Sequence, residues 1–180
     1  TDTGTALEYF DGTSWQSYVP GSEVAIPTGG TVLLVRIAVV NDGAYEGAEA
    51  FTLTATNTAS AAASGTGTIV DDGTGSVFLP GNTTGTPDAP TAALDDDRPL
   101  TVSSVTVSET APYAVFTVSG AAGQLVTLSA ASGTATLGTD TGAALQYFDG
   151  ATWQGYTPGA LVALGAGGTL QVRVAVVNDG

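Results

Sequence analysis

The chain of 180 residues contains no cysteine, histidine or methionine, and three arginines are its only basic residues, so lysine is absent as well. The lack of cysteine excludes disulfides and thiol chemistry. Without histidine or lysine, only a perturbed carboxylate could act as a general base near neutral pH, which argues against nucleophilic catalysis. No stretch approaches 18 consecutive apolar residues, so the sequence predicts no membrane insertion.

Positive charge is scarce while negative charge is abundant. Seventeen acidic residues face only Arg36, Arg98 and Arg173, which gives a net charge of −14. Such a surface repels nucleic acid and anionic membranes and attracts divalent cations. A hydrophobic fraction of 43% is sufficient for packed cores, so folded domains are expected despite 25 glycines.

The dominant pattern is an internal repeat. Residues 1–43 return almost unchanged as residues 139–180, so that Asp2 corresponds to Asp140. The period of about 138 residues is the length of a whole domain rather than of a solenoid unit. We therefore expect a tandem array in which 1–72 is the C-terminal part of one module, 73–99 is an intermodule connection, and 100–180 is the N-terminal part of the next module.

Short runs rich in valine, threonine, isoleucine and aromatics, separated by turn residues, predict β-strands and no helix. Within these runs, residues of one face alternate cleanly, as Val172, Val174 and Val176 do. The pattern predicts an all-β fold of tandem antiparallel β-sandwiches with seven to eight strands per module. The expected strands are 102–108, 113–119, 125–131, 143–148, 161–164, 169–177, 50–56 and 65–70.

Two finer expectations concern the edges of these strands. The first copy has one extra residue between Thr31 and Val35, which a bulge or the preceding turn must absorb if Ile37 is to keep the register of Val174. The connection 73–99 holds four of the eight prolines and is long for a simple linker. Part of it, residues 76–79, is expected to pair with a neighbouring sheet.

Carboxylates gather where predicted strands end. In an antiparallel sandwich the ends of alternate strands meet at one pole, where several carboxylates repel one another unless a cation lies between them. Ca²⁺ accepts six to eight oxygens in irregular geometry and suits such a site better than Mg²⁺. The acidic residues at these strand ends are Asp42, Glu46, Glu49, Asp71, Asp72, Asp140 with its counterpart Asp2, and Glu109.

Four segments, VSSVTVSE (102–109), GTD (138–140), VVNDGAYEGAEAFTLTATN (39–57) and GTGTIVDDG (65–73), resemble the Calx-beta motif. The resemblance implies a seven-stranded immunoglobulin-like sandwich that binds Ca²⁺ at one end. In tandem form the modules are also similar to the extender repeats of giant RTX-type adhesins and biofilm proteins of Gram-negative bacteria. By matching position, the implied calcium ligands are Asp2, Asp42, Glu46, Glu49, Asp71, Asp72, Glu109, Asp140 and Asp179.

Other acidic and aromatic residues have simpler interpretations. Asp11 and Asp149, in Phe-Asp-Gly turns, are expected to be hairpin residues. The Asp95–Asp97 run stays open between a solvated linker and a metal site. Trp15 and Trp153 fit packing better than sugar stacking, which leaves carbohydrate or partner binding as the alternative function. Paired carboxylates could in principle hydrolyse glycosides, but repetition in series argues against an enzyme.

The leading hypothesis is therefore a non-enzymatic structural repeat of a long secreted bacterial surface or filament protein, rigidified by Ca²⁺. It would lie outside the cell, with neighbouring copies of the repeat as partners and cell-surface or matrix polysaccharide as a further candidate. Each partial module lacks strands that the other contains, so an open sheet edge is expected in each. We expect neighbouring copies to supply these strands, with residues 100–138 folding back onto 1–72 as the less favoured arrangement.

Overall fold

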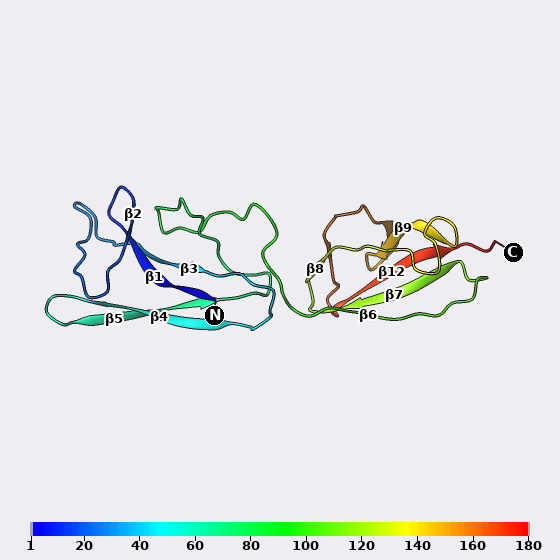
Figure 1. The fold of residues 1–180 in the computed structure, drawn as a ribbon, viewed down its shortest axis with the longest axis horizontal. Coiled ribbons are helices and arrows are strands. Elements are labelled where there is room, and N and C mark those ends of the chain that lie inside the picture. Colours follow the sequence, from blue (N-terminus) through cyan, green and yellow to red (C-terminus); the bar gives the residue numbers. More distant parts are fainter. Residues whose placement is uncertain (1, 180) are drawn as a thin grey trace. The chain divides into compact units, whose positions relative to one another are not determined.

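The computed structural model describes residues 2–179 as two compact units, Thr1–Asp97 and Arg98–Gly180. All twelve strands pair antiparallel, and no helix occurs within the described residues, which confirms the predicted all-β sandwich class (Figure 1). Unit 1 contains β1 (Thr3–Phe10), β2 (Trp15–Ser17), β3 (Val35–Val39), β4 (Glu49–Thr56) and β5 (Ala62–Ile69). Unit 2 contains β6 (Thr101–Val102), β7 (Tyr113–Ser119), β8 (Leu125–Val126), β9 (Thr141–Phe148), β10 (Trp153–Gly155), β11 (Val162–Ala163) and β12 (Thr169–Val176).

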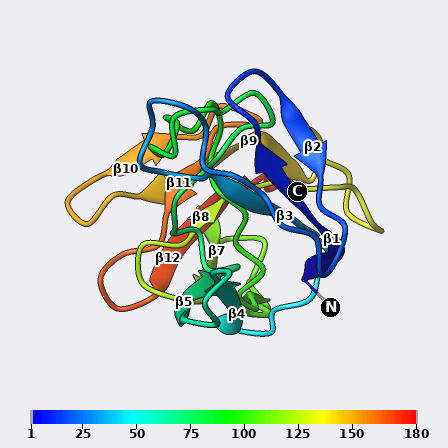
Figure 2. The ribbon, with the colours of Figure 1, turned by 90° about the vertical axis from the view of Figure 1, so that its left-hand side faces the viewer.

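Unit 1 has two layers. Strands β2, β1 and β3 form one sheet in that order, and β4 pairs with β5 in a separate hairpin. Figures 1 and 2 both show this hairpin lying on one side of the three-stranded sheet. None of the described residues of unit 1 is fully buried, so its layers enclose no closed core.

Unit 2 has a closed core between a five-stranded sheet, in the order β10-β9-β12-β7-β6, and the small β11-β8 sheet. Val118, Val126, Leu164, Leu170 and Val172 pack together there with exposed fractions of 5% or less. Burying a side chain of this size contributes roughly 1.5–3 kcal/mol. This cluster fixes the two sheets of unit 2 face to face.

The internal repeat is also a structural repeat. Strands β1 and β2 correspond to β9 and β10, with the pairs Phe10–Trp15 and Phe148–Trp153 in the same register. The aromatic rings of these two pairs lie 5.6 Å and 5.5 Å apart at nearly the same tilt. Nearly identical local sequence therefore produces nearly identical local geometry. Neither β2 nor β10 was among the expected strands.

The predicted register across the insertion is confirmed. Leu7 pairs with Ile37 in unit 1 as Leu145 pairs with Val174 in unit 2. The extra residue falls in the irregular segment before β3, so the inward face of the strand stays inward.

Several strands are shorter than expected. β7 matches its predicted range, but β6 ends at Val102 where the sequence predicts a strand to residue 108, and β8 ends at Val126 rather than at residue 131. Residues 103–108 and 127–131 form no ladder with another strand in the part of the chain that the structure describes. Alternating apolar residues are not enough to make a strand, because its backbone groups need a neighbouring strand to accept their hydrogen bonds.

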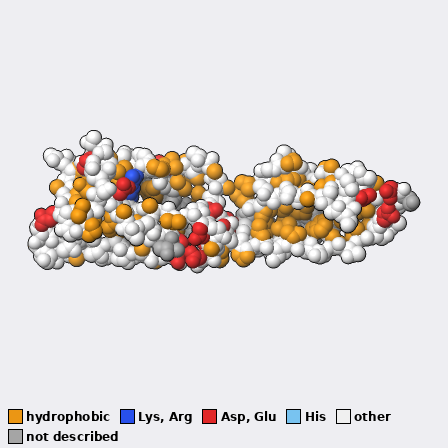
Figure 3. Space-filling view, viewed as in Figure 1, with side chains coloured by type: hydrophobic (Ala, Val, Ile, Leu, Met, Phe, Trp, Pro, Cys, Tyr) orange, Lys and Arg blue, Asp and Glu red, His pale blue; other side chains and the backbone are white. Residues whose placement is uncertain are grey.

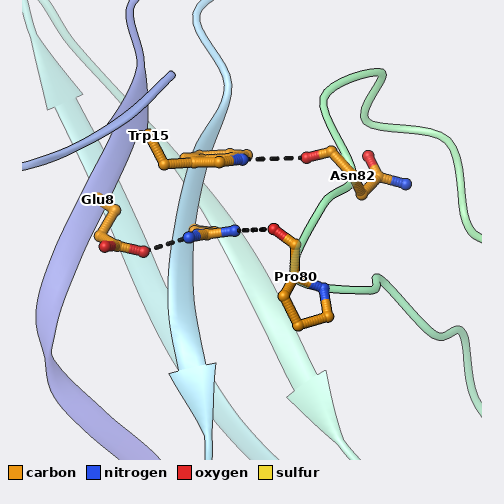
Figure 4. Close-up of polar contacts among 5 residues, drawn as sticks. Glu8, Trp15, Pro80 and Asn82 are labelled. Carbon is orange, nitrogen blue, oxygen red and sulfur yellow. Dashed lines mark hydrogen bonds and ion pairs between the residues drawn. The ribbon is translucent and has the colours of Figure 1, made fainter.

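The connection 73–99 lies against unit 1 as far as Asp97. The Trp15 indole N–H donates to the backbone oxygen of Asn82 at 3.1 Å, and Arg36 donates to the backbone oxygen of Pro80 at 2.7 Å (Figure 4). The expectation that residues 76–79 pair with a neighbouring sheet was wrong. Val77 instead forms a bridge with Asp88 inside the connection, since that loop turns back on itself.

Gly67 sets how closely the β4–β5 hairpin is packed. It lies opposite Phe51 in the ladder, and a Cβ at this position would fall 2.4 Å from the Phe51 ring. The ring thus covers the glycine, as aromatic residues do opposite a cross-strand glycine. This contact holds together the two strands whose ends carry Glu49 and Asp71.

We expect Gly67→Ala to lower the free energy of unfolding by about 1–2 kcal/mol, because the added methyl group displaces the Phe51 ring. Gly65→Ala, two residues away in the same strand, meets nothing within 4 Å and serves as the matched control. Urea unfolding of both variants measures the difference. Equal stabilities would contradict the proposed packing.

Candidate metal centre

Four strand ends of unit 1 bring carboxylates together. Asp2 immediately precedes β1, Asp42 follows β3, Glu49 begins β4 and Asp71 follows β5. The start of β1 lies beside the end of β3 because Thr3 pairs with Val39, and the start of β4 lies beside the end of β5 because Glu49 pairs with Ile69. In Figure 3, acidic side chains gather next to the N-terminal end of β1.

Two of these carboxylates, together with Glu46 from the loop before β4, have the spacing of a cation site. One oxygen from each of Asp2, Asp42 and Glu46 lies within 4.8 Å of the others. Two oxygens on opposite sides of a Ca²⁺ ion lie about 5 Å apart, because each ligand lies about 2.3–2.6 Å from the ion. These side chains could therefore bind a single ion without rearrangement of the backbone.

Asp71 lines the same pocket as Asp2 and Asp42 and holds the clearest anomaly of the site. Its Oδ2 accepts a hydrogen bond from the Glu46 backbone N–H at 2.8 Å, which ties the loop before β4 to the end of β5. Its Oδ1 is buried and has no hydrogen-bond partner. A buried carboxylate oxygen without a partner costs free energy unless a donor or a cation satisfies it.

The connection adds two more carboxylates. Asp97 donates its backbone N–H to the Asp71 carbonyl at 2.9 Å, and Gly73 donates to the Asp95 carbonyl at 2.7 Å. These bonds place Asp95 and Asp97 in the wall of an open pocket of about 200 Å³ that is also lined by Asp2, Asp42 and Asp71. The sequence alone left the Asp95–Asp97 run undecided. Its only signal was an acidic triplet close to a module boundary.

The pKa values show how closely the acids interact. A hydrogen bond with Glu49, followed by a weaker one with Glu46, lowers the pKa of Asp2. The same contacts with Asp2, together with its negative charge, raise the pKa of Glu46 and of Glu49. Burial, with Asp95 next, raises the pKa of Asp97. Asp2 therefore shares protons with its neighbours, as carboxylates do when they are too close to ionise together.

We call this cluster the acidic pole (Asp2, Asp42, Glu46, Glu49, Asp71, Asp95 and Asp97), and the remaining candidates are not among its members. Asp72 follows β5 too, but its Oδ1 accepts from the backbone and hydroxyl of Thr74, so it closes a turn. Glu109, Asp140 and Asp179 belong to unit 2. The Asp140 carboxylate accepts from the backbone N–H of Thr136 at 2.7 Å.

Unit 2 repeats only the first half of the acidic pole. The Asp140 backbone oxygen accepts from Val177 at 2.9 Å, as the Asp2 oxygen accepts from Val40 at 2.8 Å in unit 1. Within its described residues, unit 2 has no hairpin equivalent to β4–β5. The Glu46, Glu49 and Asp71 contributions therefore have no counterpart there.

The turn aspartates have the structural role predicted for them. Asp11 Oδ1 accepts from the backbone N–H groups of Thr13 and Ser14 at 2.8 Å. Asp149 makes the equivalent bonds, and these lower its pKa to about 2. Neither lies in the acidic pole.

Both tryptophans are engaged in packing contacts. The Arg36 guanidinium lies 4.1 Å from the Trp15 ring, and Arg173 lies 4.2 Å from the Trp153 ring. Each indole also packs against a phenylalanine of the neighbouring strand. Cation–π contacts of this kind occupy a ring face that a sugar would need for stacking.

Comparison with models of protein families, with curated proteins and with solved structures finds no match to this chain. Residues 2–179 contain no helix that is long and apolar enough to cross a bilayer. Any statement of function therefore depends on the acidic pole and on the repeat themselves.

The raised pKa values predict an unusual pH dependence for the metal-free protein. Glu46, Glu49 and Asp97 hold protons in the folded state at pH values where the unfolded chain has lost them. The free energy of unfolding should therefore fall as pH rises above the ordinary values, 4.5 for glutamate and 3.8 for aspartate, through the raised values. Asp2, Asp11, Asp88 and Asp149, whose pKa values are lowered, oppose this trend, but their contribution to stability changes mainly below the ordinary aspartate value of 3.8.

Urea unfolding in EDTA at a series of pH values measures this dependence. We expect stability to decrease from the titration range of these carboxylates toward neutral pH, and saturating calcium to abolish the decrease because the ion replaces the shared protons. A stability in EDTA that climbs steadily toward neutral pH would show that the acids of the pole do not repel one another.

Proposed function

We propose that the chain is a non-enzymatic structural repeat of a secreted bacterial surface or filament protein, and that Ca²⁺ at the acidic pole stiffens each complete module. The observation that carries the proposal is the buried, unpartnered Oδ1 of Asp71 beside three carboxylates that converge within 4.8 Å. A hydrogen bond from the Glu46 backbone N–H already satisfies Asp71 Oδ2, so the missing partner is specific to the other oxygen.

Calcium is the cation that this set of groups favours. All of the donors are oxygens, and they come from strand ends and loops rather than from one rigid element, which suits the irregular coordination of Ca²⁺. Mg²⁺ requires a nearly ideal octahedron of shorter bonds, and no sulfur or imidazole ligand exists for zinc. Asp2, Asp42, Glu46 and Asp71 would bind the ion, with Glu49, Asp95 and Asp97 around them.

The position of the pole explains why an ion would stiffen the module. The β2-β1-β3 sheet and the β4–β5 hairpin form separate ladders, and unit 1 encloses no fully buried residue among those described. An ion bound by Asp2 and Asp42 on the sheet and by Glu46 and Asp71 beside the hairpin would join the two layers directly. A structural metal is one of the cross-links that stabilise small domains without disulfides.

The repeat and the charge support a structural role over an enzymatic one. Tandem copies of a domain lengthen a fibre, and each copy adds another ion that stabilises it weakly. An enzyme, in contrast, gains little from identical sites in series. Extracellular calcium modules bind with dissociation constants of about 10⁻⁴–10⁻³ M, a range in which the ion is bound outside cells and lost inside them. An immunoglobulin-like topology, a position on the bacterial surface and assembly with further copies of the repeat belong to the same proposal.

Calcium should stabilise unit 1 selectively. At about 100 times the dissociation constant, ligand binding adds about 2.7 kcal/mol to the free energy of unfolding. For a domain of this size, that corresponds to a rise in Tm of roughly 10–20 °C. Differential scanning calorimetry of the chain with calcium and with EDTA measures the shift, and magnesium at the same concentration should produce a smaller one.

The repeat supplies a matched pair of variants. Asp42→Asn removes a carboxylate from the acidic pole, and Asp179→Asn makes the same change at the corresponding position of unit 2, where no hairpin completes the site. We expect the first variant to lose most of the calcium-dependent shift and the second to retain it. If EDTA leaves every transition of the unaltered chain in place, or if the two variants behave alike, calcium binding at this pole is excluded.

A further inference from the structure

Strands β3 and β12 have nearly the same sequence but different neighbours. β12 lies in the middle of its sheet, paired with β9 on one edge and with β7 on the other. β3 is paired with β1, the counterpart of β9, and has no second strand beside it within the described residues. The same strand is thus central in one unit and at an open edge in the other.

The hydrogen bonds identify which backbone groups of β3 are unpaired. Leu34 accepts from Phe10 at 3.0 Å, and Val40 donates to Asp2 at 2.8 Å, so these even-numbered residues face β1. In an antiparallel ladder, alternate residues point their N–H and C=O groups to opposite edges. The groups of Val35, Ile37 and Val39 therefore point to the open edge.

Unit 2 shows what binds at this edge. Val172 and Val174, the counterparts of Val35 and Ile37, pair there with Phe116 and Ala114 of β7. Val176, the counterpart of Val39, donates to the Pro112 oxygen at 3.2 Å. In unit 2, the segment 112–119 therefore pairs with β12, a strand of nearly the same sequence as β3.

The arginine on this strand also has fewer contacts in unit 1 than in unit 2. In unit 2, the Arg173 guanidinium lies 3.8 Å from the Tyr113 ring of β7 and 4.2 Å from the Trp153 ring. In unit 1, Arg36 has the equivalent contact with Trp15 at 4.1 Å, and no second aromatic ring accompanies it among the described contacts. Figure 4 shows the Glu8, Trp15 and Pro80 contacts that surround this position.

Burial follows the pairing. Val172 and Val174 are 5% and 7% exposed, whereas Val35 and Ile37 are only half-buried and Val39 is 60% exposed. An apolar strand with one unpaired edge is a template for the addition of another strand. What unit 1 lacks, judged against unit 2, is a strand that brings a tyrosine and two inward apolar residues.

We infer that the open edge of β3 binds a β7-type strand from another copy of this repeat, with Ala114 of that strand opposite Ile37, Phe116 opposite Val35 and Tyr113 against Arg36. The occupant is a strand of this sequence because unit 2 holds it on the same strand in the same register. The inference depends on the proposed assembly of repeat copies and not on calcium, because none of these residues belongs to the acidic pole.

A fluorescein-labelled peptide of residues 100–120 tests this inference with the intact chain in EDTA, so that a failure of the calcium proposal has no influence on the result. We expect saturable binding by fluorescence anisotropy, together with slowed hydrogen exchange of the Val35, Ile37 and Val39 amides. The peptide with Tyr113→Ala should bind more weakly, by about tenfold, because it lacks the ring for Arg36.

Two substitutions at one position locate the binding edge. Ile37→Pro removes an N–H that faces no strand, which an edge strand tolerates, while Ile37→Ala removes the same apolar contacts and keeps the N–H. We expect Ile37→Pro to abolish peptide binding with unit 2 intact, and Ile37→Ala to retain it. Val174→Pro, at the paired counterpart, should unfold unit 2 because its N–H is bonded to β7.

Three results would overturn the inference. The first is that the peptide does not bind to the chain. The second is that Ile37→Pro leaves the affinity of the peptide unchanged, because the peptide would then bind by displacing β7 from β12. The third is that the chain forms dimers without the peptide and that Ile37→Pro abolishes them, which would show that β3 pairs with a second β3 instead.

Discussion

The antiparallel pairing of β1 with β3 is the interaction on which the arrangement of unit 1 depends. It brings the start of β1 beside the end of β3, and so places Asp2 and Asp42 at one end of the sheet. The β4–β5 ladder does the same for Glu49 and Asp71. Backbone hydrogen bonds thus assemble a charge cluster that the side chains themselves oppose, since the carboxylates repel one another.

The acidic pole is costly where no cation compensates its charge, and contacts within unit 1 limit that cost. Asp2 shares protons with Glu46 and Glu49, and the Asp71 Oδ2 accepts a backbone N–H. Among the described residues of unit 1, Asp71 Oδ1 is the one buried side-chain oxygen without a partner. Because the pole joins the sheet, the hairpin and the connection, a cation there would act on the whole of unit 1 rather than on one loop.

Comparison of the two copies of the repeat separates the effects of local sequence from those of neighbouring strands. The Phe10–Trp15 and Phe148–Trp153 pairs have nearly the same ring distance and tilt because their contacts are local in sequence. Burial of the strand that follows differs, since Val174 is 7% exposed and Ile37 is half-buried. That difference arises from β7, a strand distant in sequence. The burial of corresponding residues in the two copies therefore depends on which strands lie beside them.

The sequence by itself determined the all-β class, the repeat, the matching register of β3 and β12 across the insertion, and the turn roles of Asp11 and Asp149, because alternation and turn chemistry act over a few residues. It identified Asp42, Glu46, Glu49 and Asp71 as acids at strand ends. Only the tertiary structure decided that Asp95 and Asp97 join them, that Asp72 closes a turn instead, and that residues 103–108 form no strand. Those outcomes depend on which distant backbone groups meet, and no local pattern of residues encodes that.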